Sequence, residues 1–178
     1  KKEVGSLDTL VHSIAFAPKE ALEGRTIETS REAARVALDI SAYSLVLMCR
    51  YAEPLMADRE ASVIAMTYLG GERVVRNYNV MGVAKAALDM YIRYLAEDLG
   101  PKTIRINGIS AGPIKTLAAK GVSGLGAMIE RYEEKAPLRR NVTQEDIGHT
   151  AVFLAGPGAR GITGEIIHVD SGYHVLGM

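Results

Sequence analysis

Four short apolar runs, separated by longer segments of helical pattern, constrain the fold of this chain most strongly. They are Leu10 to Ala17, Ser62 to Tyr68, Thr103 to Ile109 and Glu165 to Val169. The first two are nearly continuous in apolar and small residues, which is typical of strands buried on both faces of a sheet. Strands that alternate with helices favour a parallel sheet with crossover helices. The sequence therefore predicts an α/β fold with helices on both faces of the sheet.

The intervening segments carry helix signals at both ends. Thr29 and Glu32 have the spacing of a capping box and open a segment that keeps a helical apolar pattern to Met56. Thr143 and Asp146 cap a later helix in the same way. Further helices are expected from Asn79 to Gly100, from Ala127 to Lys135 and, after Thr143, to about Ala155. Because no linker is long enough to divide the chain, residues 1–178 are expected to form one domain.

Composition narrows the possible function classes. The chain has 178 residues, a net charge of zero, 48% apolar and 24% charged residues, so no nucleic-acid or membrane-surface partner is indicated. No apolar run reaches 18 residues, which predicts no membrane span. Cys49 is the only cysteine, which favours a reducing, cytoplasmic setting. The four histidines have no metal-ligand spacing with one another or with Cys49, so no metal site is expected.

Polar or loop-forming residues follow three of the expected strands. They lie at Ser13 to Pro18, at Thr67 and Tyr68, and at Ser110 to Thr116. Ligands of parallel α/β sheets bind at the carboxyl ends of the strands. These three segments are therefore expected to converge on one site.

Tyr68, Tyr78 and Lys85 are the candidate catalytic residues at that edge. Tyr78 and Lys85 stand seven residues apart, which is nearly two helical turns and places them on one face. A nearby cation would lower the pKa of a phenol, and a tuned phenol can hydrogen-bond an oxygen on which charge develops. The alternative is structural, with Tyr78 at a helix start, Lys85 in solvent and Tyr68 packed in the sheet.

Several other features point away from competing chemistries. The chain has no strand, glycine-rich turn and helix in the order that cradles a pyrophosphate. The glycines at 121, 124 and 126 have the wrong order for such a turn and are expected to give flexibility to a lid over a pocket. His12 and His168 lie in apolar strands and are expected to be core residues with satisfied hydrogen bonds.

The order and spacing of several segments resemble the NADH-dependent enoyl-acyl carrier protein reductases, a divergent branch of the short-chain dehydrogenase/reductases. Tyr68, Tyr78 and Lys85 match that family's spacing, whereas related ketoacyl reductases carry Tyr-x-x-x-Lys. The resemblance covers essentially the whole chain and rests on these further segments: His12-Ser-Ile-Ala-Phe-Ala-Pro18, Asp39-Ile-Ser-Ala-Tyr-Ser44, Asn77-Tyr-Asn-Val-Met-Gly-Val-Ala-Lys85, Ser110-Ala-Gly-Pro-Ile-Lys-Thr-Leu-Ala-Ala119 and Gly164-Glu-x-x-x-Val-Asp170.

This resemblance implies a Rossmann-like fold that reduces the trans-2 double bond of an enoyl thioester on acyl carrier protein with NADH, in fatty acid biosynthesis. It implies that Tyr78 binds the thioester carbonyl oxygen, that Tyr68 is a second tyrosine at the thioester, and that Lys85 holds the nicotinamide ribose. The segments implied to contact the cofactor also include Ser13, Ile14, Ile114, Lys115, Thr116, Leu117 and Ala118. The acyl pocket is implied at Ala17, Met81, Ala118 and Val122 together with the two tyrosines.

The same resemblance implies a homotetramer, with Asn79 to Leu99 and Glu165 to Met178 as candidate contact surfaces. Two departures leave alternatives open. Ala15 stands where many relatives have glycine. No segment resembles the family's opening strand and phosphate-binding turn, so the sequence given is expected to lack that part of the fold, either because it is omitted or because the chain is a non-catalytic fragment. A ketoacyl reductase of the same superfamily is a further alternative.

Overall fold

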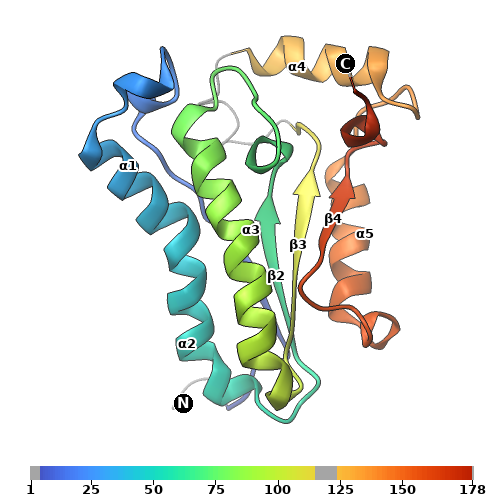
Figure 1. Ribbon diagram of the computed structural model, residues 1–178. Coiled ribbons are helices and arrows are strands. Elements are labelled where there is room, and N and C mark those ends of the chain that lie inside the picture. Colours follow the sequence, from blue (N-terminus) through green and yellow to red (C-terminus); the bar gives the residue numbers. More distant parts are fainter. Residues whose placement is uncertain (1–4, 115–123, 178) are drawn as a thin grey trace.

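A four-stranded parallel sheet forms the centre of the computed structural model, which describes residues 5–114 and 124–177 (Figure 1). Its strands are β1 (Thr9–His12), β2 (Ser62–Thr67), β3 (Arg105–Ala111) and β4 (Ile166–Val169), and they lie in the order β1-β2-β3-β4. The register pairs Thr9 with Ser62, Ser62 with Arg105 and Gly108 with Ile166. The predicted α/β class is therefore confirmed.

The helices cover both faces of this sheet and the carboxyl ends of its strands (Figure 1). They are α1 (Arg31–Leu38), a π-helical turn (Asp39–Tyr43), α2 (Ser44–Met56), α3 (Asn79–Leu99), α4 (Leu125–Lys135) and α5 (Gln144–Ala155). On one face α2 and α3 pack on strand residues such as Val63 and Ile106. On the other face α5 packs on Ile64 and Ile109. In Figure 1, α4 crosses above the carboxyl ends of the strands.

Strands β1 and β3 differ most from the prediction. β1 ends at His12 rather than Ala17 because the backbone of Phe16 pairs with Ser41 instead of β2: the Ser41 hydroxyl accepts from the Phe16 amide and donates to its carbonyl, both at 2.9 Å. β3 begins at Arg105 rather than Thr103 because Thr103 takes a left-handed conformation with φ of 57°.

The ends of some helices were predicted more accurately than these strand boundaries. Thr143 and Asp146 form the predicted capping box, because the Thr143 hydroxyl accepts from the Asp146 amide and the Asp146 carboxylate accepts from the Thr143 amide. The predicted box at Thr29 is wrong, since Ser30 is the residue that caps α1. The predicted helix to Met56 is also interrupted by the π-helical turn, a feature frequent near functional sites.

Glycines let the turn after β2 approach α3 closely. The 3-10 turn Leu69–Gly71 follows Tyr68, and its Gly70 carbonyl lies against Gly82 of α3. A Cβ added to Gly82 would stand 2.7 Å from that carbonyl oxygen, closer than real Cβ atoms come. This approach brings the end of β2 beside the first two turns of α3, and it requires glycine at position 82.

We expect Gly82→Ala to destabilise the fold. Overpacking typically costs about 1–3 kcal/mol, and here the obstacle is a backbone carbonyl that cannot rotate away. The matched control is Gly148→Ala in α5, where no atom lies within 4 Å of an added Cβ and the change should be neutral or mildly stabilising. Urea unfolding of both variants measures the difference, and equal stabilities would contradict the close approach.

Candidate active site

Tyr68, Tyr78 and Lys85 meet where β2 ends and α3 begins. Tyr68 follows β2 directly, Tyr78 is the residue that precedes the first turn of α3, and Lys85 lies two turns further on. The rings of Tyr68 and Tyr78 pack edge to face, with centroids 5.1 Å apart and an interplanar angle of 73°. The Tyr68 hydroxyl donates to the Met128 sulfur of α4 at 3.1 Å.

Lys85 is a buried cation. Its side chain is only 6% exposed, and its amine donates a 2.7 Å hydrogen bond to the carbonyl oxygen of Met66 in β2. Burial lowers the pKa of Lys85 to about 8, although the charge of Asp89, one turn further along α3, acts to raise it. The side chain therefore stays largely protonated at neutral pH. The alternative of a solvated Lys85 is wrong.

Asp89 was not among the predicted site residues. Burial raises the pKa of its carboxyl to about 6, an effect opposed by the neighbouring Thr67 hydroxyl, and its Oδ1 atom has no hydrogen-bond partner among the described residues. An added Cβ at Gly71 would stand 2.9 Å from Oδ2, so the turn after β2 lies directly over this carboxyl. Asp89 could have been found from the sequence because it lies four residues after Lys85, which places both side chains on one face of the same helix.

The expectation that Lys85 would lower the pKa of Tyr78 is wrong. Burial, with added effects of Tyr68 and Asp89, holds the pKa of Tyr78 well above its ordinary value. Burial also raises the pKa of Tyr68. Both side chains are therefore neutral phenols at neutral pH. The Tyr78 hydroxyl makes no hydrogen bond within the described chain, so its proton is available to a ligand.

His12 ends β1 on the other side of β2 from β3. Its Nε2 lies 2.8 Å from the Ser44 hydroxyl, and that hydroxyl donates at 2.6 Å to the carbonyl of Ile40. Because the hydroxyl proton is used there, Nε2 must donate and Nδ1 carries a lone pair. Nδ1 is buried with no partner among the described residues, so the prediction of a fully satisfied core histidine is wrong.

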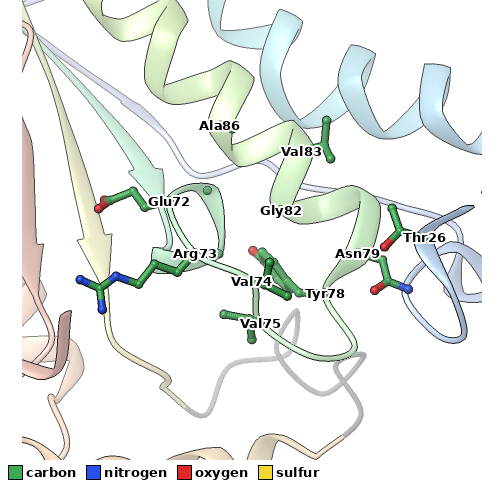
Figure 2. Close-up of a pocket in the computed structure, with 12 residues that line it drawn as sticks. Thr26, Glu72, Arg73, Val74, Val75, Tyr78, Asn79, Gly82, Val83 and Ala86 are labelled. Carbon is green, nitrogen blue, oxygen red and sulfur yellow. The ribbon is translucent and has the colours of Figure 1, made fainter. Parts of the chain in front are cut away.

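Two cavities flank the tyrosine pair. The Tyr78 cavity, of about 330 Å³, lies between Tyr78, Val74 and Val83, with Thr26 and Asn79 at its side (Figure 2). The Tyr68 cavity, of about 500 Å³, lies between Tyr68, α4 and the chain after β4. Both share the segment from Arg73 to Val75 as a wall. Substrate-sized space is therefore present beside each phenol.

The other candidate residues have diverse surroundings. Ser13 and Ile14 are exposed just beyond β1, and Ile114 is half-buried beyond β3, so the sheet order places them at the same carboxyl edge as Tyr68. Ala17 packs against a small cluster that contains Val80, and Met81 is buried in α3. These described residues line neither cavity. The remaining candidates lie outside the described residues: Lys115, Thr116, Leu117, Ala118 and Val122.

The sequence predicts neither a metal site nor a membrane span. Among residues 5–114 and 124–177, no three histidine, cysteine or carboxylate side chains gather in a way that could hold a metal ion. No helix in that part of the chain is long and apolar enough to cross a membrane.

Comparison with known proteins identifies relatives over nearly the whole chain. Residues 1–174 match a family described as enoyl-(acyl carrier protein) reductase. An NADH-named enoyl-[acyl-carrier-protein] reductase of Bacillus cereus is 54% identical over 99% of this chain and 69% of its own length. An NADPH-named relative from Staphylococcus aureus is 55% identical over 98% of this chain and 68% of its own length.

Solved structures agree with this match. The crystal structure of the Bacillus cereus reductase with NADP⁺ and indole naphthyridinone superposes with a TM-score of 0.96 at 53% identity, covering 100% of this chain and 69% of that one. The structure of a reductase from Anaplasma phagocytophilum in complex with NAD has a TM-score of 0.92 at 46% identity, over 99% of this chain and 67% of that one.

The burial of His12 predicts a loss of stability in mild acid. Burial, helped by the nearby Lys85 charge, lowers the pKa of His12 to about 4 from 6.5. Between these values the unfolded chain binds a proton that the folded chain does not. The stability contributed by neutral His12 is therefore complete above the unfolded pKa and lost as pH falls toward 4, by about 3 kcal/mol at most.

Urea unfolding from about pH 7 to about pH 4.5 tests this expectation. His12→Gln should lose less stability over that range than the unsubstituted protein, because its side chain takes up no proton. His149→Gln, which removes an exposed histidine of α5, should lose as much as the unsubstituted protein. Parallel pH profiles for all three proteins would contradict a neutral, buried His12.

Proposed function

This chain belongs to the enoyl-(acyl carrier protein) reductase family, and we propose that Tyr68, Tyr78 and Lys85 form its catalytic centre. The chain reduces the trans-2 double bond of enoyl thioesters carried on acyl carrier protein, with NADH, in fatty acid elongation. The observation that carries the catalytic assignment is the packing of two neutral phenols beside a buried lysine at the end of β2. Their spacing in the sequence is that of the family.

Tyr78 acts as the hydrogen-bond donor to the thioester oxygen. Addition of hydride to the β-carbon moves negative charge onto that oxygen and forms an enolate. A donor already in place stabilises this charge without reorganisation. A neutral phenol can supply that bond whereas a phenolate cannot, so the raised pKa of Tyr78 suits this role. Protonation at the α-carbon then completes the saturated thioester.

Tyr68 positions Tyr78 and closes the other side of the thioester site. Its ring packs edge to face against Tyr78, and its hydroxyl is engaged by the Met128 sulfur. Rotation of Tyr78 is further limited by Gly70, where an added Cβ would stand 2.5 Å from the Tyr78 ring. The assigned donor is thus held between the turn after β2 and its neighbouring aromatic ring.

Lys85 has the donors that a ribose requires. An ammonium has three N–H groups, and within the described chain the Met66 carbonyl accepts only one of them. The two others suit the vicinal hydroxyls of the nicotinamide ribose, so the residues present fit NADH. When bound, NADH supplies the hydride. Exposed Ser13 and Ile14, and half-buried Ile114, lie at the same sheet edge and are assigned to the cofactor's path.

The remaining assignments concern substrate, assembly and location. Ala17 and Met81 are assigned to the acyl pocket, and the residues beyond Ile114 to the cofactor and the substrate loop. A homotetramer is supported by apolar side chains left exposed on the two candidate surfaces: Met90 and Tyr94 of α3 are 49% and 69% exposed, and Val175 near the end of the chain is 64% exposed. A cytoplasmic location is assigned because Cys49, the only cysteine of the sequence, fits a reducing compartment. The domain is assigned as a single Rossmann-type unit.

We expect Tyr78→Phe in the full-length protein to lower kcat for a crotonyl thioester by about a hundredfold or more, because one oxyanion donor is lost. The rate of NADH oxidation measures the effect. Tyr51→Phe is the control, since this exposed tyrosine of α2 lines neither cavity and lies outside the candidate assembly surfaces. Turnover of Tyr78→Phe at the unsubstituted rate would remove Tyr78 from the mechanism. Faster reduction of an acetoacetyl thioester than of the crotonyl thioester would favour a ketoacyl reductase.

A further inference from the structure

The Tyr68 cavity has a strongly cationic rim. Arg73 and Arg76, from the segment between β2 and α3, and Arg131 of α4 all line it, and no carboxylate is among its described lining residues. None of the three arginines makes an ion pair within residues 5–114 and 124–177. Three unpaired guanidinium groups around one cavity indicate an anionic ligand.

One of these arginines is fixed in place. Arg73 Nη1 donates a 2.6 Å hydrogen bond to the carbonyl of Leu176, near the end of the chain. This contact uses one of its five N–H donors and leaves the others for a ligand. The Asp170 carboxylate lies behind this region, but it accepts from the amides of Gly172 and His174 and from the His174 ring. That carboxylate is therefore engaged within the chain and does not neutralise the rim.

The floor of the cavity contains an unused hydrogen-bonding group. Tyr132 of α4 is 2% exposed, and its hydroxyl lies beside that of Tyr68 but makes no hydrogen bond of normal geometry with any described residue. Its ring stacks on Tyr173, with centroids 3.8 Å apart and planes 12° apart, so the side chain is firmly held. An unpartnered buried hydroxyl is costly, and an acceptor supplied by a ligand would satisfy it.

The Tyr68 cavity lies towards the β4 edge of the sheet. It is bounded by α4 and by the chain that follows β4, whereas Ser13 and Ile14, assigned to the cofactor, follow β1. β1 and β4 are the opposite edges of the sheet. A ligand in this cavity would therefore approach the thioester site from the side away from Ser13 and Ile14.

We propose that the Tyr68 cavity binds the phosphate group of the arm that carries the acyl thioester, with Arg73, Arg76 and Arg131 as its ligands. The proposal rests on the proposed function, because the thioester at Tyr68 and Tyr78 defines where the arm begins. The arginines pair with the phosphate oxygens, and the polar part of the arm supplies an acceptor to the Tyr132 hydroxyl. The acyl carrier's prosthetic arm, a phosphopantetheine, has this combination of thioester, amides and phosphate.

Binding of the saturated product arm tests the proposal without relying on turnover. The full-length protein is titrated by calorimetry with butyryl-4′-phosphopantetheine and with butyryl-pantetheine, which lacks the phosphate. In the Arg76→Gln/Arg131→Gln double variant, we expect the Kd for the phosphorylated ligand to rise about tenfold or more, while the Kd for butyryl-pantetheine is unchanged. The Arg50→Gln/Arg160→Gln double variant is the control, since it removes the same charge from exposed positions outside the cavity.

Two results would overturn the proposal. If the arginine variant bound both ligands as the unsubstituted protein does, or lost affinity for both equally, the arginines would not bind the phosphate. If it bound both small ligands normally but showed a raised KM for crotonyl-acyl carrier protein alone, the arginines would contact the carrier protein's surface instead. The proposed function fails separately, in the unsubstituted protein, if no crotonyl thioester is reduced.

Discussion

The hydrogen bond from the buried Lys85 ammonium to the Met66 carbonyl is the interaction on which this site depends. It joins the second turn of α3 to the last residues of β2, so the helix that carries Tyr78 is tied to the strand that carries Tyr68. Burying a cation is costly unless it is partnered. The Met66 carbonyl and the nearby Asp89 carboxyl offset that cost only in part, and the lowered pKa of Lys85 reflects the remainder. A ligand that accepts the two remaining N–H groups would complete the partnership.

The same contact explains why the sheet edge is open at this point. Parallel pairing between β1 and β2 ends at His12 and Ala65. The carbonyl of the next residue in β2, Met66, accepts a hydrogen bond from Lys85 instead of from β1. The chain beyond His12 is then held by Ser41 of the π-helical turn, which leaves Ser13 and Ile14 exposed. A strand end that separates from its neighbour in this way is where ligands of parallel α/β sheets bind. The end of β1–β2 pairing, the position of α3 and the placement of the candidate site therefore all follow from the hydrogen bond between Lys85 and Met66.

Much of the fold follows from local sequence signals, whereas the electrostatics of the site do not. The apolar runs located all four strands, and the Thr143 and Asp146 pattern located the start of α5 because capping depends on neighbouring residues. β1 was predicted too long because its end is determined by Ser41, a contact distant in sequence. The pKa of Tyr78 was expected to fall because spacing places a cation nearby, but burial dominates and no spacing reveals it. Tyr132 was missed because its neighbour Tyr68 lies 64 positions earlier and only the fold brings them together.

The titration of Lys85 shows whether its buried ammonium connects α3 to β2. In protein labelled with ¹³C at the lysine Cε positions, the Lys85 resonance can be assigned by its loss in Lys85→Met and followed with pH by NMR. A buried ammonium held by one carbonyl should titrate near 8 without ligand. A midpoint at or above 10.5, the ordinary value for lysine, would mean that the amine is solvated and does not connect α3 to β2.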